Sequence, residues 1–69
     1  MQRLFDEVVR LAKEKGMSLA AVERKAGLGT GTVRRWQGRI PRASSIAAVA
    51  EALGTDRIRL VRIAMEEIR

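Results

Sequence analysis

The sequence contains no cysteine and no histidine. Without cysteine, the chain has neither a disulfide framework nor a thiolate metal site. Without histidine, it lacks the commonest general base and the commonest metal ligand. Its eight acidic residues are scattered over the predicted outer faces of helices, so no catalytic constellation converges. We therefore expect no enzyme activity, no catalytic residue, no metal, no cofactor and no small-molecule substrate.

Long apolar runs are also missing. No segment approaches the ~18 apolar residues typical of a membrane-spanning helix. Asp6 and Glu7 interrupt the stretch in which a signal peptide would be apolar. These absences predict no membrane partner and a cytoplasmic location, with nucleoid association if the sequence is natural. At 69 residues the chain is near the lower size limit for an unassisted core, so we expect one domain, residues 1–69.

Acidic residues are absent from one part of the chain. Between Arg24 and Ala50 there are six basic residues and no acidic residue, whereas the remainder is balanced. The whole excess of +6 therefore falls in this window. A positive charge concentrated in this way indicates a polyanionic partner. A solvated arginine-rich face is the alternative that the charge alone leaves open.

Helical periodicity is present through most of the sequence, and no segment shows strand alternation. Apolar spacing, N-cap residues and glycine stops predict an all-α, five-helix fold. The helices are expected at about residues 2–15, 18–26, 30–37, 43–53 and 56–68. Ser18 is the predicted N-cap of the second helix and Gly29 that of the third.

The fifth predicted helix has a wide apolar surface. Ile58, Val61, Met65 and Ile68 follow a 3-4-3 spacing, which predicts that they face the core. Leu60, Ile63 and Ala64 widen the apolar face beyond the needs of one small bundle. A homodimer formed through this C-terminal helix is therefore one possibility, and a monomer is the other.

The middle of the sequence joins two short helices by a glycine-containing turn, which is the pattern of a helix-turn-helix. Gly27 must adopt a positive φ so that the two helices cross steeply. Val33 and Trp36 share the inner face of the second of these helices, and we expect both in the core. Its outer arc carries Thr30, Gly31, Arg34 and Arg35.

The stretch SLAAVERKAGLGTGTVRRW, residues 18–36, resembles the helix-turn-helix of the Cro/repressor-like (XRE) family of DNA-binding domains. The stretch IPRASSIAAVAEALG, residues 40–54, is similar to the proline-led fourth helix of that family. The resemblance covers about residues 3–54 and implies a repressor-like bundle of five helices. It also implies sequence-specific binding of double-stranded DNA of the transcription-regulator type. In this family the third helix enters the major groove and the second lies across the backbone.

The resemblance assigns roles to individual positions. It implies base reading by Thr30, Gly31 and Arg35, and we expect Arg34 beside them to read a base or hold a phosphate. Arginine suits this role because its planar fork matches guanine O6 and N7. The residues that the resemblance implies at phosphate or in the minor groove are Arg42 and, through backbone amides, Ser18 and Leu19.

Further phosphate contacts follow from the residues themselves. Arg39 and Arg42 flank the rigid turn at Pro41, and Ser44 and Ser45 lie at the positive end of the fourth helix. We also expect Thr32 to contact a phosphate or the minor groove. Gly29 and Gly31 leave the start of the third helix without side chains, which we expect to allow close approach of its backbone to a groove or a phosphate.

The chain departs from the family pattern at three places. Leu19 replaces a frequent glutamine, and the connection from Trp36 to Pro41 is about two residues shorter than is common. Glu23 stands where the family usually has a small residue. We expect its side chain to point outward or to pair with a nearby arginine. These departures affect the docking angle rather than the fold.

Two other functions and two origins stay open. The main functional rival is an antitoxin-like or other protein-interaction module, and RNA binding is disfavoured because Phe5 and Trp36 both fall in core phases. Arginine outnumbers lysine eleven to three, and asparagine and tyrosine are also absent. A high-GC or thermophilic source would explain this composition, and so would redesign of a helix-turn-helix scaffold into an engineered DNA binder.

Overall fold

The computed structural model describes residues 2–68, which form five helices joined by short turns and no strand. The helices are α1 (Gln2–Glu14), α2 (Leu19–Ala26), α3 (Thr32–Arg35), α4 (Ala43–Leu53) and α5 (Arg57–Ile68). The predictions of an all-α chain and of five helices are therefore confirmed.

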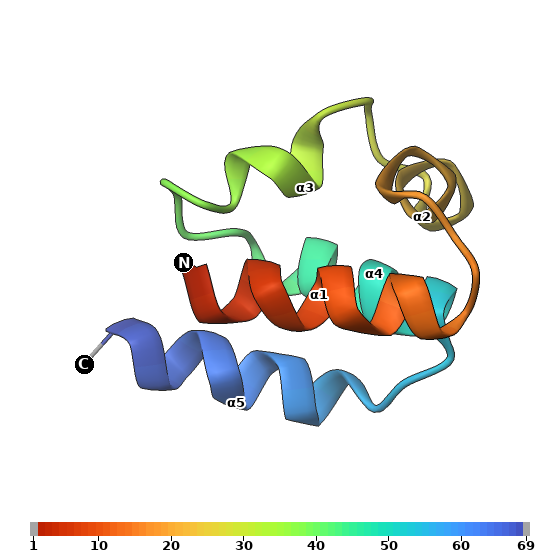
Figure 1. Ribbon diagram of the computed structural model, residues 1–69. Coiled ribbons are helices and arrows are strands. Elements are labelled where there is room, and N and C mark those ends of the chain that lie inside the picture. The colour runs from red at the N-terminus through yellow and green to blue at the C-terminus, as the bar shows by residue number, and fades with distance from the viewer. Residues whose placement is uncertain (1, 69) are drawn as a thin grey trace.

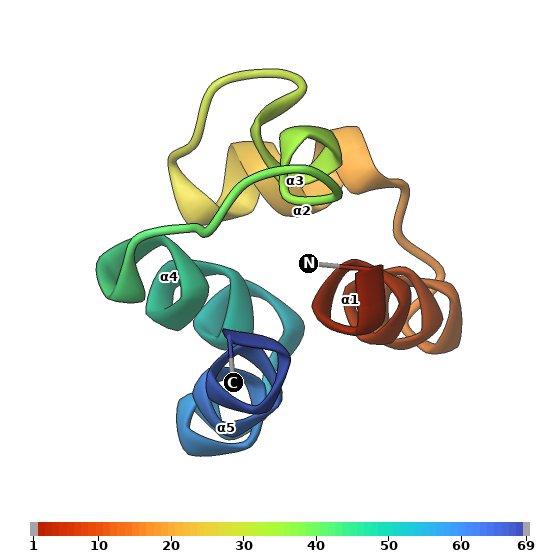
Figure 2. The same ribbon diagram turned by 90° about the vertical axis from the view of Figure 1, so that its left-hand side faces the viewer.

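The helices form one compact bundle. α1 and α5 lie antiparallel, and α4 lies beside α5 (Figures 1 and 2). α2 packs against α4 and α1, and α3 contacts α2. α3 and α5 therefore lie on opposite sides of the molecule, with α1 and α4 between them (Figure 1).

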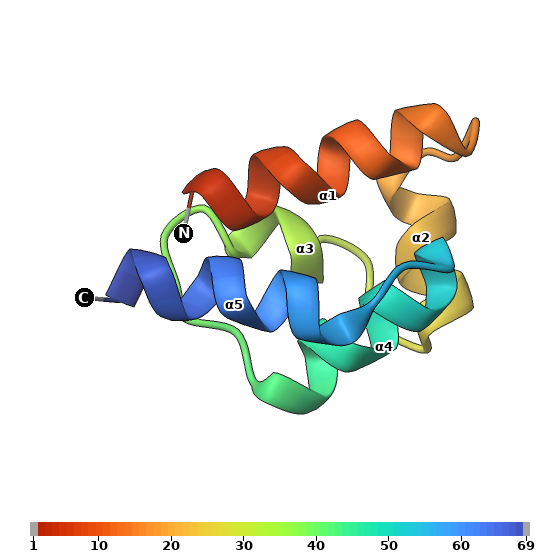
Figure 3. The same cartoon turned by 90° about the horizontal axis from the view of Figure 1, so that it is seen from below.

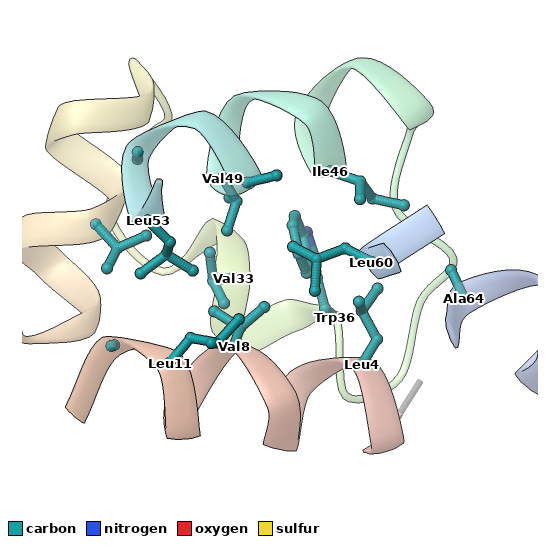
Figure 4. Close-up of a cluster of buried hydrophobic side chains, with 14 residues drawn as sticks. Leu4, Val8, Leu11, Val33, Trp36, Ile46, Val49, Leu53, Leu60 and Ala64 are labelled. Atoms are coloured by element: carbon teal, nitrogen blue, oxygen red, sulfur yellow. The ribbon is translucent and has the colours of Figure 1, made fainter. Parts of the chain in front are cut away.

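The core draws buried side chains from every helix. Val33 is fully buried and Trp36 is only 3% exposed, and the indole points into the middle of the cluster (Figure 4). Both were predicted as core residues, and the prediction is confirmed. The other members are Leu4, Val8, Leu11, Ala12, Val22, Ile46, Val49, Ala50, Ala52, Leu53, Leu60 and Ala64.

Both ends of α2 follow the sequence signals. The Ser18 hydroxyl oxygen accepts a hydrogen bond from the Ala21 amide at 3.1 Å, so Ser18 is the N-cap. Gly27 has a φ of 75°, which only glycine adopts at little cost. The Leu28 amide then donates to the Glu23 carbonyl at 2.8 Å and closes the helix end. The positive φ predicted for Gly27 is confirmed.

α3 is shorter than predicted, because it begins at Thr32 rather than Thr30 and ends at Arg35 rather than Gln37. Its N-cap is Gly31, not Gly29. Gly31 has a φ of 87°, a left-handed conformation that cannot be part of a right-handed helix, so the helix starts one residue later. After Arg35 the chain continues in tighter turns of the 3₁₀ type, because the Gly38 amide donates to the carbonyl of Arg35, three residues earlier.

The predicted core face of α5 is wrong at three of its four positions. Ile58, Met65 and Ile68 are 59%, 63% and 55% exposed, whereas Leu60 and Ala64 are buried. The fourth residue, Val61, is half-buried and packs against the core. The cause is the rotation of α5 about its axis, which its neighbours α1 and α4 determine. Apolar residues occur around more than half of this helix, so its periodicity alone could not select the inward side.

Polar contacts between α1 and α5 fix that rotation. The two carboxylate oxygens of Glu67 accept hydrogen bonds from the Arg3 and Leu4 amides at 2.9 and 2.8 Å. Arg59 pairs with Glu7 at 3.2 Å. Burial raises the pKa of Glu67, but the two amide hydrogen bonds outweigh it and the pKa lies below the usual 4.5. Glu67 therefore caps the N-terminus of a helix that is distant in sequence.

Candidate nucleic-acid interface

Most of the predicted contact residues lie between the turn before α3 and the start of α4, and the other two, Ser18 and Leu19, lie at the start of α2. α3 runs at the surface above α1 and leads into the extended segment before α4 (Figure 1). Val33 and Trp36 anchor this segment to the core, while Arg34 and Arg35 are exposed. Burial of one face thus turns the two guanidinium groups toward solvent.

A buried carboxylate holds the start of α3. Glu23, on α2, is 3% exposed, and its oxygens accept hydrogen bonds from the Gly31 amide at 3.1 Å and the Val33 amide at 2.9 Å. The expectation that Glu23 points outward or pairs with an arginine is therefore wrong. The first amides of a helix have no intrahelical acceptor, and Glu23 supplies one from the preceding helix.

This contact limits what Gly31 can offer to a ligand. Its amide donates to Glu23, and its carbonyl accepts from the Arg35 amide at 3.2 Å. Both backbone groups are thus engaged within the protein, and no phosphate can bind the Gly31 amide without displacing Glu23. The structural reason for glycine at this position is its left-handed φ. Gly31 can therefore contribute to recognition only through its lack of a side chain, which lets a ligand come close to the backbone.

The polar side chains near the turn are partly committed. The Thr32 hydroxyl donates to the Gly29 carbonyl at 2.6 Å and so stabilises the turn rather than offering its proton to a phosphate. Thr30 is exposed at the tip of the same turn. The Ser18 oxygen is engaged as the N-cap. Within residues 2–68 no acceptor is recorded for the Leu19 amide, which leaves that donor free at the start of α2.

Arginines from α3 and from the following segment meet around one surface hollow. Arg35, Arg39 and Arg42 all line it, although they are separated by up to seven positions in sequence. The remaining lining residues are Thr32, Trp36, Ile40, Pro41 and Ser45. The structure therefore brings together five of the predicted contact residues, namely Thr32, Arg35, Arg39, Arg42 and Ser45. Thr30, Arg34, Ser44, Ser18 and Leu19 lie outside the hollow.

The guanidinium groups at this hollow have no acidic partner among the described residues. The ion pairs of the described residues join Arg3 to Glu66, Arg10 to Glu7 and Glu14, and Arg59 to Glu7, all on α1 and α5. None of them involves an arginine of the hollow. The hollow keeps a positive field, which is the condition for attracting a polyanion.

The start of α4 adds backbone donors at the same place. Arg42 is the N-cap residue, and no side chain caps this helix. Its carbonyl accepts from the Ser45 and Ile46 amides at 3.0 and 3.1 Å, which leaves the Ala43 and Ser44 amides directed outward from the first turn. The positive end of an eleven-residue helix therefore adjoins the arginine-lined hollow.

Two residues important to this surface were missed by sequence reasoning. Glu23 lies on the same helical arc as Leu19, Val22 and Ala26, and this phase is the signal that could have predicted its burial. Ile40 is 67% exposed at the rim of the hollow. No periodicity marks it, because it lies in the extended segment before Pro41.

Comparison of the chain with models of known protein families, with curated proteins and with solved structures gave no match. Among the described residues, no group of acidic side chains is arranged to hold a metal ion. None of the helices in residues 2–68 combines the length and the apolar character needed to cross a bilayer.

Proposed function

We propose that this protein binds double-stranded DNA in a sequence-specific manner, as transcription regulators do. In this proposal α2 and α3 form a helix-turn-helix of the Cro/repressor-like type, and α3 lies in the major groove. The observation that carries the proposal is the clustering of Arg35, Arg39 and Arg42 around one hollow beside α3, without a carboxylate partner in residues 2–68.

Each part of this surface has a role in the proposal. Arg35 reads a base edge, since it is exposed on the last turn of α3 and its fork suits guanine. Arg34, next to it, clamps a phosphate or reads a second base. Arg39 and Arg42 hold the backbone on one strand, and the outward amides at the start of α4 add uncharged donors.

Glu23 has a role in the same proposal, although it does not touch DNA. A helix of four residues has little stability of its own, because helix nucleation is unfavourable. The two hydrogen bonds from Glu23 tie its first turn to α2. The carboxylate of Glu23 thus occupies the place in which a helix N-terminus often binds a phosphate. In this proposal, contact of α3 with DNA therefore depends on its side chains rather than on its first amides.

Selection of sites from a randomised duplex library, performed with the purified protein at two salt concentrations, tests the proposal. We expect enrichment of a short site and a fall of log K with log salt at a slope of about −4 to −5, for four to six phosphate contacts. Weak binding of all duplexes without an enriched site would contradict it.

The exposed Ile40 favours one rival function, a protein-interaction module of the antitoxin-like kind. An apolar side chain at the rim of the hollow gains more from a protein surface than from phosphates. Ile40→Ser separates the two functions. DNA binding should change little in this variant, whereas a protein partner that covers Ile40 should bind more weakly, as shown by titration against each ligand.

A further inference from the structure

The outer side of α5 carries an apolar stripe that is largely exposed. Ile58, Met65 and Ile68 are each more than half exposed, and Val61 between them is half-buried and packs partly against the core. At 3.6 residues per turn the four side chains fall within about 80° of one another. Seen from the side of α5, no other helix lies in front of α5 (Figure 3).

The spacing of the stripe is that of a helix-packing seam. Side chains at 58, 61, 65 and 68 alternate by three and four residues, the pattern with which one helix packs along another. The stripe is narrow because Leu60 and Ala64 are buried toward α1 and α4, and charged residues occupy much of the rest of α5. A bilayer surface is bound by a broader apolar face, whereas a narrow seam fits a second helix. Met65 at its centre can adapt to the shape of such a helix.

The side chains that directly flank the stripe are arginines, and a carboxylate, that of Glu66, lines a surface hollow together with Arg62. Arg62 lies along one edge and Arg57 along the other, both are exposed, and neither has an ion pair within residues 2–68. The acidic residues near the C-terminal end of α5 are used within the protein. Glu66 pairs with Arg3, and Glu67 accepts from the first amides of α1. The edges of the seam are therefore unneutralised guanidinium groups.

We propose that this surface, Ile58, Val61, Met65 and Ile68 with Arg57 and Arg62, docks an acidic amphipathic helix of a partner protein. Glutamates or aspartates that flank the apolar stripe of the partner would pair with the two arginines. A second copy of this chain fits less well. In a parallel pair Arg57 of one copy would meet Arg62 of the other, and in an antiparallel pair Arg62 of one copy would meet Arg62 of the other.

The docking surface is independent of the proposed DNA contacts, because α5 and α3 lie on opposite sides of the bundle (Figure 1). A partner on α5 would leave Arg35, Arg39 and Arg42 accessible. The partner could thus be bound while the opposite face is occupied, and either surface can be tested without the other.

Two synthetic helical peptides test the proposal with the full chain. Both carry leucine at their a and d positions, one with glutamate and the other with lysine at every e and g position. Fluorescence anisotropy gives their affinities, and amide NMR shifts map where they bind. We expect the glutamate peptide to bind at least about fivefold more tightly than the lysine peptide, with shifts confined to α5. Met65→Asp should abolish this binding.

Charge reversal provides the matched comparison. Arg57→Glu with Arg62→Glu should weaken the glutamate peptide and strengthen the lysine peptide. Arg34→Glu with Arg35→Glu makes the same change of net charge on the opposite face and should leave both affinities within about twofold. All of these side chains are exposed, and circular dichroism checks that each variant is folded.

Four results would overturn the proposal. The first is equal affinity for both peptides, and the second is binding of the glutamate peptide that maps to α3. The third is a dimer in sedimentation equilibrium that Met65→Asp dissociates, since a second copy would then cover α5. The fourth is binding to phosphatidylglycerol-containing vesicles with shifts on α5 and no peptide binding, since the surface would then be a membrane contact.

Discussion

The carboxylate of Glu23 and the backbone amide of Val33 are joined by a 2.9 Å hydrogen bond, although ten residues separate them in the sequence. The same carboxylate accepts from the Gly31 amide. A side chain of α2 thus satisfies two donors at the start of α3, in a place from which water is largely excluded. The geometry of the α2–α3 unit depends on a buried acidic residue as well as on apolar packing.

Replacing Glu23 should therefore destabilise the fold. Glu23→Ala leaves two amides without an acceptor, and we expect the free energy of unfolding to fall by about 2–4 kcal/mol. Glu23→Gln keeps one acceptor and should lose about half as much. Urea denaturation measures both effects. Glu51→Ala is the matched control, since the exposed Glu51 side chain makes no hydrogen bond or ion pair within residues 2–68 and should change stability by less than about 0.5 kcal/mol. Equal effects of Glu23→Ala and Glu51→Ala would contradict the role of Glu23.

Gly31 and Gly29 should respond differently to alanine. Gly31 has a φ of 87°, and a Cβ placed there meets no atom within 4 Å, so its cost is backbone strain alone. We expect Gly31→Ala to lower stability by about 1–2 kcal/mol. Gly29 has no positive φ, and its added Cβ would lie 3.7 Å from the Thr32 hydroxyl oxygen, an ordinary contact. Thermal unfolding of the two variants should show a lower midpoint for Gly31→Ala only.

Acid should weaken the contact between α1 and α5. The pKa of Glu67 is lower in the folded protein than its usual 4.5, so its contribution is complete above that pH and is lost as the pH falls through the folded pKa. Glu67→Gln should reduce the free energy of unfolding by about 0.5–1 kcal/mol at neutral pH. The gap from the parent protein should narrow as the pH falls below 4.5 and through the folded pKa. A gap that acid titration does not narrow before the protein unfolds, or one equally large in Glu51→Gln, would be inconsistent with this assignment.

Arg35 and Arg42 should differ in their effect on DNA binding if the proposed function holds. Arg35→Ala should weaken the selected site by about 1–3 kcal/mol and relax specificity at one base pair. Arg42→Ala should weaken all duplexes to a similar extent and reduce the salt slope by about one. Anisotropy titrations with the selected site and a scrambled duplex measure both. An equal loss on the two duplexes for Arg35→Ala would exclude base reading by this residue.

The sequence determined the local features of this protein. Apolar spacing predicted five helices, and Ser18 and Gly27 marked the ends of α2, because caps and left-handed turns depend on the residue itself and its near neighbours. Val33 and Trp36 were assigned to the core because they share a face on a segment whose other face is polar. In each case a short stretch of chain contains the whole physical cause.

Only the tertiary structure decided how the helices are rotated and what their polar groups contact. Apolar side chains occur around much of α5, so contacts with α1 and α4, rather than periodicity, buried Leu60 and left Met65 outside. The phase of α2 is compatible with burial of Glu23, but its hydrogen-bond partners, the Gly31 and Val33 amides, come from the start of α3, and the sequence of α2 does not reveal them. The physical reason is the same in both cases. The residues that bury or hydrogen-bond a side chain here lie on another helix, and only folding of the chain brings the two helices together.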